Sequence, residues 1–153
     1  MKKLTLTLFI FSFLFVLTAA SGRAQTLVQL RAHIPFEFHV AGQTLPAGDY
    51  FIERINRQTS QETVLISSTQ GRARVLVGMG PIHAKSTPDL SRLNFSDYAG
   101  RYFLSQLFVA GEEFGLELPR SRAERDWREA AEYSPNGPKA GTVVEVTLSS
   151  RRQ

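Results

Sequence analysis

The stretch that decides the fold is His33-Ile34-Pro35-Phe36-Glu37-Phe38-His39-Val40, in which apolar and polar residues alternate. Ile, Phe, Phe and Val occupy the even positions, and His, Pro, Glu and His occupy the odd ones. Strict alternation of period two predicts a strand with one buried face and one solvent-facing face. Pro35 has no backbone N–H, so we expect an edge or a break in the hydrogen-bond ladder near that position.

Short apolar segments separated by turn residues continue this pattern along the chain. They predict six further strands, over Asp49–Ile55, Thr63–Ser67, Ala73–Met79, Ser91–Tyr98, Arg101–Ala110 and Thr142–Leu148. We expect Gly80-Pro81 to end the strand that precedes it and Ile82–Leu90 to form a loop. The best hairpin signal is Tyr98-Ala99-Gly100-Arg101, where a short turn separates two apolar segments.

The period of the pattern changes near Ser121, which indicates a helix. Ser121-Arg122-Ala123-Glu124 has the form of a capping box, and it predicts a helix over Arg122–Glu132. Four residues share one face of this helix: Ala123, Trp127, Ala130 and Ala131. Because so short a helix is unstable alone, we expect Trp127 to anchor that face to the sheet.

About seven strands and one short C-terminal helix before the last strand predict a mostly all-β fold. The class is a single antiparallel β-sandwich or a small barrel. A helix before the last strand is also the order of lipocalin-type barrels. We rank the sandwich above the closed barrel, because the chain is short for eight strands and its first strand has no Gly-x-Trp motif.

Residues 1–24 have the three-part pattern of a secretory signal peptide. A basic start is followed by the apolar run Leu4–Leu17 and then by small residues, which predicts cleavage after Ala24, with Ala20 as the second choice. The run is shorter than the roughly 20 residues of a spanning helix, so no transmembrane segment is expected after cleavage. We therefore predict an exported protein, periplasmic or extracellular, with one domain over 25–149 and a polar tail over 150–153.

Composition excludes several classes of function. Loss of the leader leaves 15 of the 18 basic residues against 14 acidic ones, so the mature chain is nearly neutral and nucleic-acid binding is not expected. The chain contains no cysteine, which excludes disulfides and thiolate metal sites. Arginine outnumbers lysine 13 to 2 after residue 24. This bias is typical of bidentate anion recognition or, as we favour, of genome composition.

Motifs that carry chemistry are scarce. The chain has no Gly-x-Ser-x-Gly, no Gly-x-Gly-x-x-Gly, no phosphate loop and no His-Glu-x-x-His, so we predict no catalytic residue and no cofactor. His33, Glu37 and His39 share the outward face of the first strand, and His83 lies in the expected long loop. They are the candidate metal ligands, although His33 is too remote unless the strand bends at Pro35. We favour a solvated polar face over a metal site.

Three blocks resemble a group of small exported bacterial β-rich proteins with no assigned activity. The first is Ile34-Pro-Phe-Glu-Phe-x-Val-x-Gly-x-x-Leu-Pro-Ala-Gly-x-Tyr50, and the later two are Arg101-Tyr-Phe-Leu-Ser105 and Ser121-Arg-Ala-Glu-Arg125. The resemblance implies a single exported β-rich domain, and it assigns no catalytic residue.

Two functions are consistent with these patterns. The first is an exported, non-enzymatic binding or envelope-associated interaction module, whose partner is an unidentified protein or envelope component. The alternative is a small-ligand or metal-binding barrel-like protein, with or without enzymatic activity. Convergence of the three histidines would favour the alternative. An exposed Trp127 would favour the binding module and would be its candidate partner contact.

Overall fold

The protein is described by a computed structural model that places residues 29–56, 61–133 and 142–150. The predicted signal peptide lies outside the described residues. Of the predicted tail, only Ser150 is described, and it belongs to the last strand. Within the described part of the chain, the structure has no helix with the length and hydrophobicity to span a bilayer.

The described residues form ten strands and one helix. In chain order these are β1 (Gln29–Ile34), β2 (Phe38–Val40), β3 (Gln43–Leu45), β4 (Gly48–Asn56), β5 (Glu62–Ser68), β6 (Arg74–His83), β7 (Arg92–Tyr98), β8 (Arg101–Phe108), β9 (Phe114–Glu117), α2 (Arg122–Glu132) and β10 (Thr142–Ser150). The protein is therefore mostly β, with a short helix before the last strand, as the sequence predicts.

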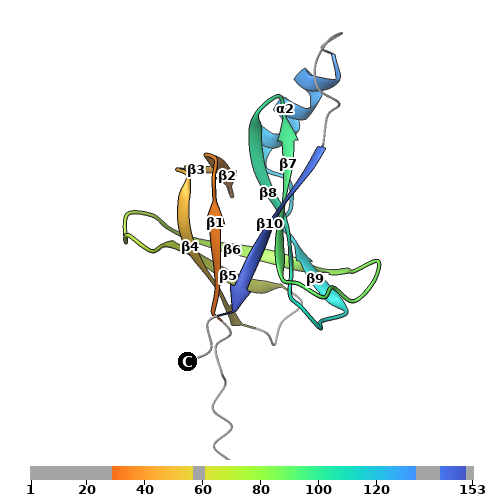
Figure 1. The fold of residues 1–153 in the computed structure, drawn as a ribbon. Coiled ribbons are helices and arrows are strands. Elements are labelled where there is room, and N and C mark those ends of the chain that lie inside the picture. Colours follow the sequence, from red (N-terminus) through yellow and green to blue (C-terminus); the bar gives the residue numbers. More distant parts are fainter. Residues whose placement is uncertain (1–28, 57–60, 134–141, 151–153) are drawn as a thin grey trace, which may run out of the picture.

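Eight of the strands close into an antiparallel barrel (Figure 1). The order around it is β8-β7-β10-β1-β4-β5-β6-β9, and β9 pairs back onto β8 through Gln106↔Glu117 and Leu107↔Leu116. The small hairpin β2–β3 lies beside the other half of β8, with β2 and β8 parallel. Our ranking of the sandwich above the closed barrel is therefore wrong, because β9 supplies an eighth strand that joins β6 to β8.

Strand β9 closes the barrel, and the sequence pattern does not reveal it. It pairs with the far end of β6, where Gly80 lies opposite Glu117 and His83 opposite Phe114. The prediction that Gly80-Pro81 ends β6 is thus wrong. Gly115 permits this closure, because a Cβ built on it would lie 2.5 Å from the Phe108 ring.

The stretch His33–Val40 forms two strands instead of one. Pro35 interrupts the ladder as predicted, so that β1 stays between β10 and β4 while β2 crosses to β8. The predicted alternation is confirmed. Ile34, Phe38 and Val40 are buried, and Phe36 is half-buried.

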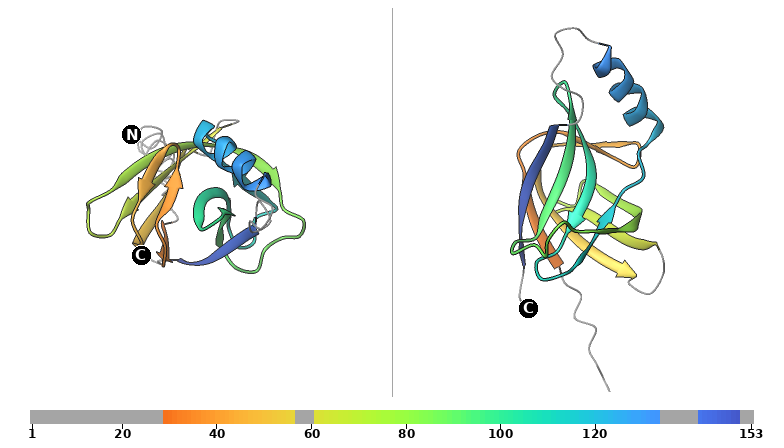
Figure 2. Two further views of the ribbon diagram at one scale, coloured as in Figure 1. Left: turned by 90° about the horizontal axis from the view of Figure 1, so that it is seen from above. Right: turned by 90° about the vertical axis from the view of Figure 1, so that its right-hand side faces the viewer.

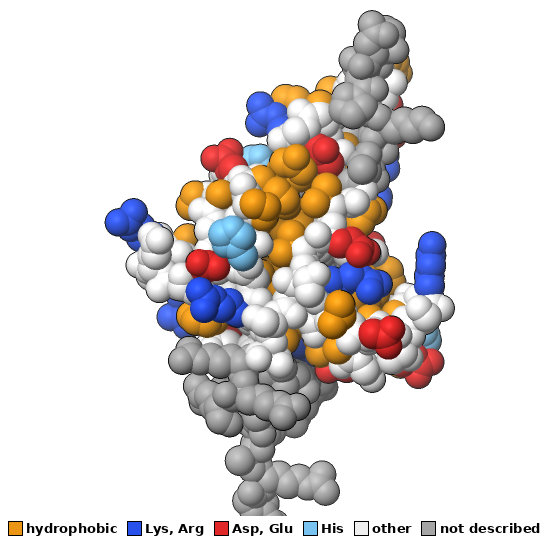
Figure 3. Space-filling model, in the orientation of Figure 1, with side chains coloured by type: hydrophobic (Ala, Val, Ile, Leu, Met, Phe, Trp, Pro, Cys, Tyr) orange, Lys and Arg blue, Asp and Glu red, His pale blue; other side chains and the backbone are white. Residues whose placement is uncertain are grey.

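The crossing segment is held by aromatic contacts. The ring of Phe36 stacks on Tyr102, with centroids 4.0 Å apart, and meets the edge of Phe95 at 5.3 Å. Pairing between β1 and β10 is limited to Leu30–Ala32, and hydrophobic side chains reach the surface where these strands diverge (Figure 3). Phe36 thus packs on the core at the end of the barrel nearest β2.

Side chains fill the barrel interior. Phe38 contacts Tyr50 and Phe95 edge-on, at centroid distances of 5.2 and 5.5 Å, and all three are buried. At the end of the barrel where β4 meets β5, the guanidinium of Arg54 donates two hydrogen bonds of 2.7 Å to the Glu62 carboxylate and a third to Glu112. The barrel is therefore a packed scaffold with one charged end.

Candidate functional site

Helix α2 lies outside the barrel, at the end that carries the β7–β8 hairpin, and it contacts β7 (Figure 2). It spans Arg122–Glu132 as the sequence predicts, and the Ser121 Oγ accepts a hydrogen bond from the Glu124 N–H at 3.1 Å, as a capping box requires. The turn of the hairpin, Ala99-Gly100, has both residues at positive φ, the geometry of a tight two-residue turn.

The face of α2 that meets the barrel differs from the predicted one. Of the four residues of the predicted face, Ala131 is half-buried, whereas Trp127 is 38% exposed and Ala123 and Ala130 are exposed. Glu124 is the buried residue of the helix. The half-buried Arg128, four residues after Glu124, continues that face. Alanines offer little apolar area, and Glu124 gains polar partners on the barrel.

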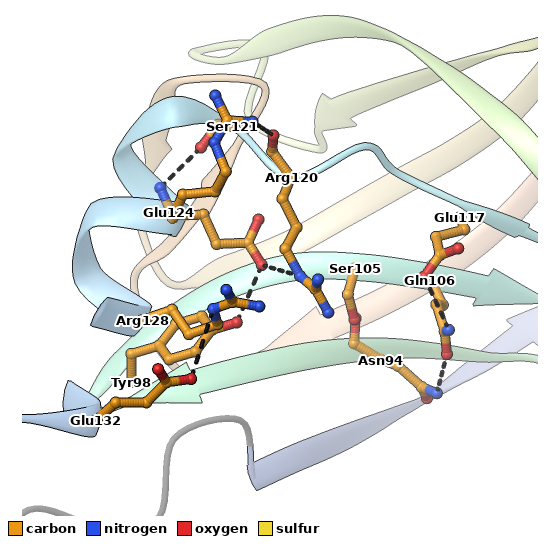
Figure 4. A network of polar contacts seen from close by, with 11 residues as sticks. Asn94, Tyr98, Ser105, Gln106, Glu117, Arg120, Ser121, Glu124, Arg128 and Glu132 are labelled. Carbon is orange, nitrogen blue, oxygen red and sulfur yellow. Dashed lines mark hydrogen bonds and ion pairs between the residues drawn. The ribbon is translucent and has the colours of Figure 1, made fainter. Parts of the chain in front are cut away.

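Glu124 is only 4% exposed, and its partners come from two segments (Figure 4). The Tyr98 hydroxyl donates to its Oε1 at 3.4 Å, and the Arg120 Nε lies 3.9 Å from the same oxygen. Burial raises the pKa of this carboxyl above its usual value. Arg120, Tyr98, the Ser121 backbone and Arg128 oppose that shift without cancelling it.

A small cavity adjoins Glu124. Its volume is about 10 Å³, room for about one water molecule, and His39, Phe103 and Leu118 are among its lining residues. It separates the first turn of α2 from the β2–β3 hairpin, so the helix base rests partly on a polar cavity instead of continuous apolar packing.

On one flank of α2, Trp127 stacks against Arg101. The guanidinium carbon of Arg101, the first residue of β8, lies 3.9 Å from the centroid of the indole ring. This is a cation–π contact, which holds the ring in place while leaving part of it exposed. Tyr133, which caps the helix, is 89% exposed. An aromatic and cationic surface therefore faces away from the barrel core.

The opposite flank of α2 borders an open groove of about 530 Å³. Arg120, Arg125 and Arg128 line it from the helix side, and Gly80, Pro81 and Glu117 belong to the β6–β9 pair across from them. The Arg125 Nη1 donates to the Arg120 carbonyl at 3.0 Å, and the Arg128 Nε lies 3.7 Å from the Glu132 Oε1. The groove is thus rich in guanidinium groups.

The four candidate metal ligands do not come together. His33 lies 3.2 Å from the Asp49 carboxylate, His39 lies 2.9 Å from the Thr44 hydroxyl, and the His83 ring packs on Phe114. Glu37 is exposed in the break between β1 and β2. Among the described residues no group of three or more His, Asp or Glu side chains could hold a metal ion. The break at Pro35 separates His33 from His39 instead of bending them toward one ion.

Sequence reasoning missed most of the junction between α2 and the barrel. It identified Trp127 and the cap but not Tyr98, Arg101 or Arg120 as neighbours of α2. Tyr98 and Glu124 are 26 residues apart in sequence, and no local pattern joins them. One residue could have indicated the true contact face. Glu124 is a carboxylate three residues before Trp127, so the two side chains lie on neighbouring sides of the helix.

Comparison of the chain with protein families, with curated proteins and with solved structures finds no match. The resemblance of the Ile34–Tyr50 block to small exported bacterial proteins therefore stays a prediction.

Proposed function

We propose that the mature chain is an exported, non-enzymatic binding module that contacts its partner through the exposed side of α2. The observation that carries this proposal is the indole of Trp127, which is 38% exposed and held against Arg101. The partner is a protein or another component of the cell envelope. Trp, Tyr and Arg are the residues that most often dominate binding energy at interfaces.

Pre-orientation of the indole supports the proposal. A side chain that is already fixed loses little conformational entropy when a partner covers it, so more of the contact energy appears as affinity. Here the Arg101 guanidinium stacks on one face of the indole ring. Arg101 is the first residue of β8 and directly follows the tight turn of the β7–β8 hairpin. The contact with Arg101 therefore favours one orientation of the indole before binding.

The filled barrel also supports a role in binding at the surface. Buried side chains such as Phe38, Tyr50 and Phe95 occupy the interior. The barrel then serves as a scaffold, and the contact surface is the helix mounted outside it. Functional groups held by a rigid scaffold are common among binding domains.

Export is part of the proposal, and it rests on the leader pattern of residues 1–24 and on the resemblance described above. N-terminal sequencing of the protein from the periplasm or medium tests it, and the mature chain should begin near Gln25. A mature species that retains Leu4–Leu17 would contradict export as a free protein and would indicate an N-terminal anchor.

The partner contact is tested by crosslinking and capture from envelope extract with purified wild-type protein and two variants. We expect Trp127→Ala to lose the captured partner, because truncation of a hot-spot residue costs at least about 2 kcal/mol of binding energy. Leu76→Ala is the matched control, since Leu76 is an exposed apolar residue on β6, away from α2. Equal capture by wild type and Trp127→Ala would refute this contact surface.

A further inference from the structure

We propose that the groove between α2 and the β6–β9 pair binds a phosphate or sulfate group through Arg120, Arg125 and Arg128. This site is separate from the proposed partner contact. Residues of an α-helix are spaced by about 100°, so Arg125 lies about 160° around α2 from Trp127. Either surface can therefore be tested without disturbing the other.

The shape of the groove suits a charged group attached to a larger molecule. Its volume of about 530 Å³ exceeds what one oxyanion needs, and it is open to solvent. The wall opposite the arginines includes Gly80 and Pro81, which offer no polar or bulky side chain, and a Cβ placed on Gly80 would meet nothing within 4 Å. A ligand can thus approach the guanidinium groups without displacing protein atoms.

The guanidinium groups have donors to spare. A guanidinium carries five N–H donors, and among the described residues Arg125 uses only one nitrogen, on the Arg120 carbonyl. The Arg128 Nε is enclosed and has no hydrogen-bond acceptor, since the Glu132 oxygen at 3.7 Å is too far away. Arg120 likewise lies 3.9 Å from its carboxylate neighbour. An oxyanion in the groove would supply acceptors to the guanidinium nitrogens that are not enclosed, which leaves out the Arg128 Nε.

The charge balance of the groove favours an anion. The described residues that line it include three arginines and one carboxylate, Glu117, which lies 3.5 Å from the Gln106 amide nitrogen. Outside the lining, Arg120 is paired with Glu124 at 3.9 Å and Arg128 with Glu132 at 3.7 Å, so Arg125 is the arginine of the groove that forms no ion pair with a carboxylate among the described residues. Glu124 lies behind Arg120, and the burial that raises the pKa of its carboxyl favours the uncharged form.

Three arginines along one groove favour a tetrahedral oxyanion over a carboxylate. A carboxylate presents two oxygens in one plane, which a single arginine can bind in bidentate fashion. Phosphate and sulfate present oxygens in several directions and accept from guanidinium groups on different sides. All three positions carry arginine, whose planar fork matches such oxyanions better than the point charge of lysine.

Binding is tested by calorimetric and NMR titration of the mature protein with inorganic phosphate and sulfate, at ionic strength held constant with chloride. We expect saturable binding, with shifts confined to the groove residues. Arg125→Gln and Arg128→Gln should each weaken it by roughly tenfold or more, because each removes charge-assisted hydrogen bonds. Glu117→Gln should strengthen binding, since it removes the opposing charge.

Arg122→Gln is the matched control, because Arg122 is exposed on the same helix and does not line the groove. Vesicles that contain phosphatidic acid provide a second arm. Binding to these vesicles alone, lost in Arg125→Gln, would place the phosphate on a lipid, whereas binding of inorganic phosphate would assign a small ligand. Absence of saturable binding in both arms, or an equal loss from Arg122→Gln, would overturn the proposal.

Discussion

The barrel interior and the α2 junction are built on opposite principles. Inside the barrel, Phe38 and Phe95 have no measurable exposure and pack edge-on. At the junction, the buried residue is Glu124, and its contacts are a hydroxyl at 3.4 Å and a guanidinium at 3.9 Å. Apolar burial supplies most of the stability of a fold, whereas exposed polar contacts add little. The apolar barrel interior therefore supplies most of the stability, whereas the surroundings of α2 supply the polar and aromatic groups available for binding.

The largest expected effect is on the barrel side of this comparison. Phe38→Ala should lower the free energy of unfolding by about 3–5 kcal/mol, because it removes a fully buried ring from contact with Tyr50 and Phe95. Urea unfolding measures the loss. Glu37→Ala, at the exposed neighbouring position, should change stability by less than about 0.5 kcal/mol. Equal losses from the two variants would show that the register of β2 is wrong.

His39 sharpens this prediction. The sequence places it on a solvated face, where its removal should cost under about 0.5 kcal/mol. In the structure its ring stacks on Phe103 at 4.7 Å, and its Nδ1 lies 2.9 Å from the Thr44 hydroxyl. We therefore expect His39→Ala to cost about 1 kcal/mol, the range of one net hydrogen bond.

Arg54 at the charged end of the barrel shows whether a buried polar network contributes to stability as much as the apolar core does, or as little as the contacts of α2. Arg54→Met should cost about 3 kcal/mol, because it leaves the Glu62 and Glu112 carboxylates without their common partner in a largely buried site. Urea unfolding measures the change. Adding Glu62→Gln to Arg54→Met should recover part of the lost stability. If Arg54→Met alone were as stable as wild type, the ion-pair network would be solvated.

A smaller effect is expected from Glu124, whose contribution depends on pH. Since burial raises the pKa of its carboxyl, the folded protein holds this proton at higher pH than the unfolded chain does. The stability from this group is full below the usual carboxyl pKa and is lost as pH rises through the raised value. Glu124→Gln should therefore gain stability relative to wild type as pH rises from below the usual carboxyl pKa through the raised one.

The control for this prediction is Glu129→Gln, at an exposed position of the same helix, which should show no such trend. Urea unfolding across the pH range measures both variants. The charged or titratable groups around Glu124 are Arg120, Arg128, Tyr98 and, across the adjacent cavity, His39. Both variants keep these groups, so a difference between their pH trends comes from Glu124. A difference that does not change with pH would mean that Glu124 is solvated and α2 is loosely placed.

Local patterns predicted most of the elements. Alternation located the buried side chains of β2, the turn residues located the β7–β8 hairpin, and the capping box located the start of α2. These features depend on residues close in sequence, where turn chemistry and side-chain period act directly.

Long-range features escaped the same reasoning. Closure through β9 depends on Gly115 lying against Phe108, and the face of α2 depends on the hydrogen bond that the Tyr98 hydroxyl donates to Glu124. Neither pair is marked by a period or motif. Apolar periodicity predicted that Trp127 packs on the sheet, because it weighs hydrophobicity alone. In the structure the ring stays 38% exposed and contacts the sheet through the guanidinium of Arg101.

The most direct test of the account is the fluorescence of Trp127, since it is the only tryptophan of the chain. If α2 presents this residue at the surface of a packed barrel, the folded protein should show the emission of a partly exposed indole, quenched readily by iodide or acrylamide. Strongly blue-shifted emission that resists quenching until the barrel unfolds would contradict this. Trp127 would then belong to the core, and α2 would not carry the binding surface.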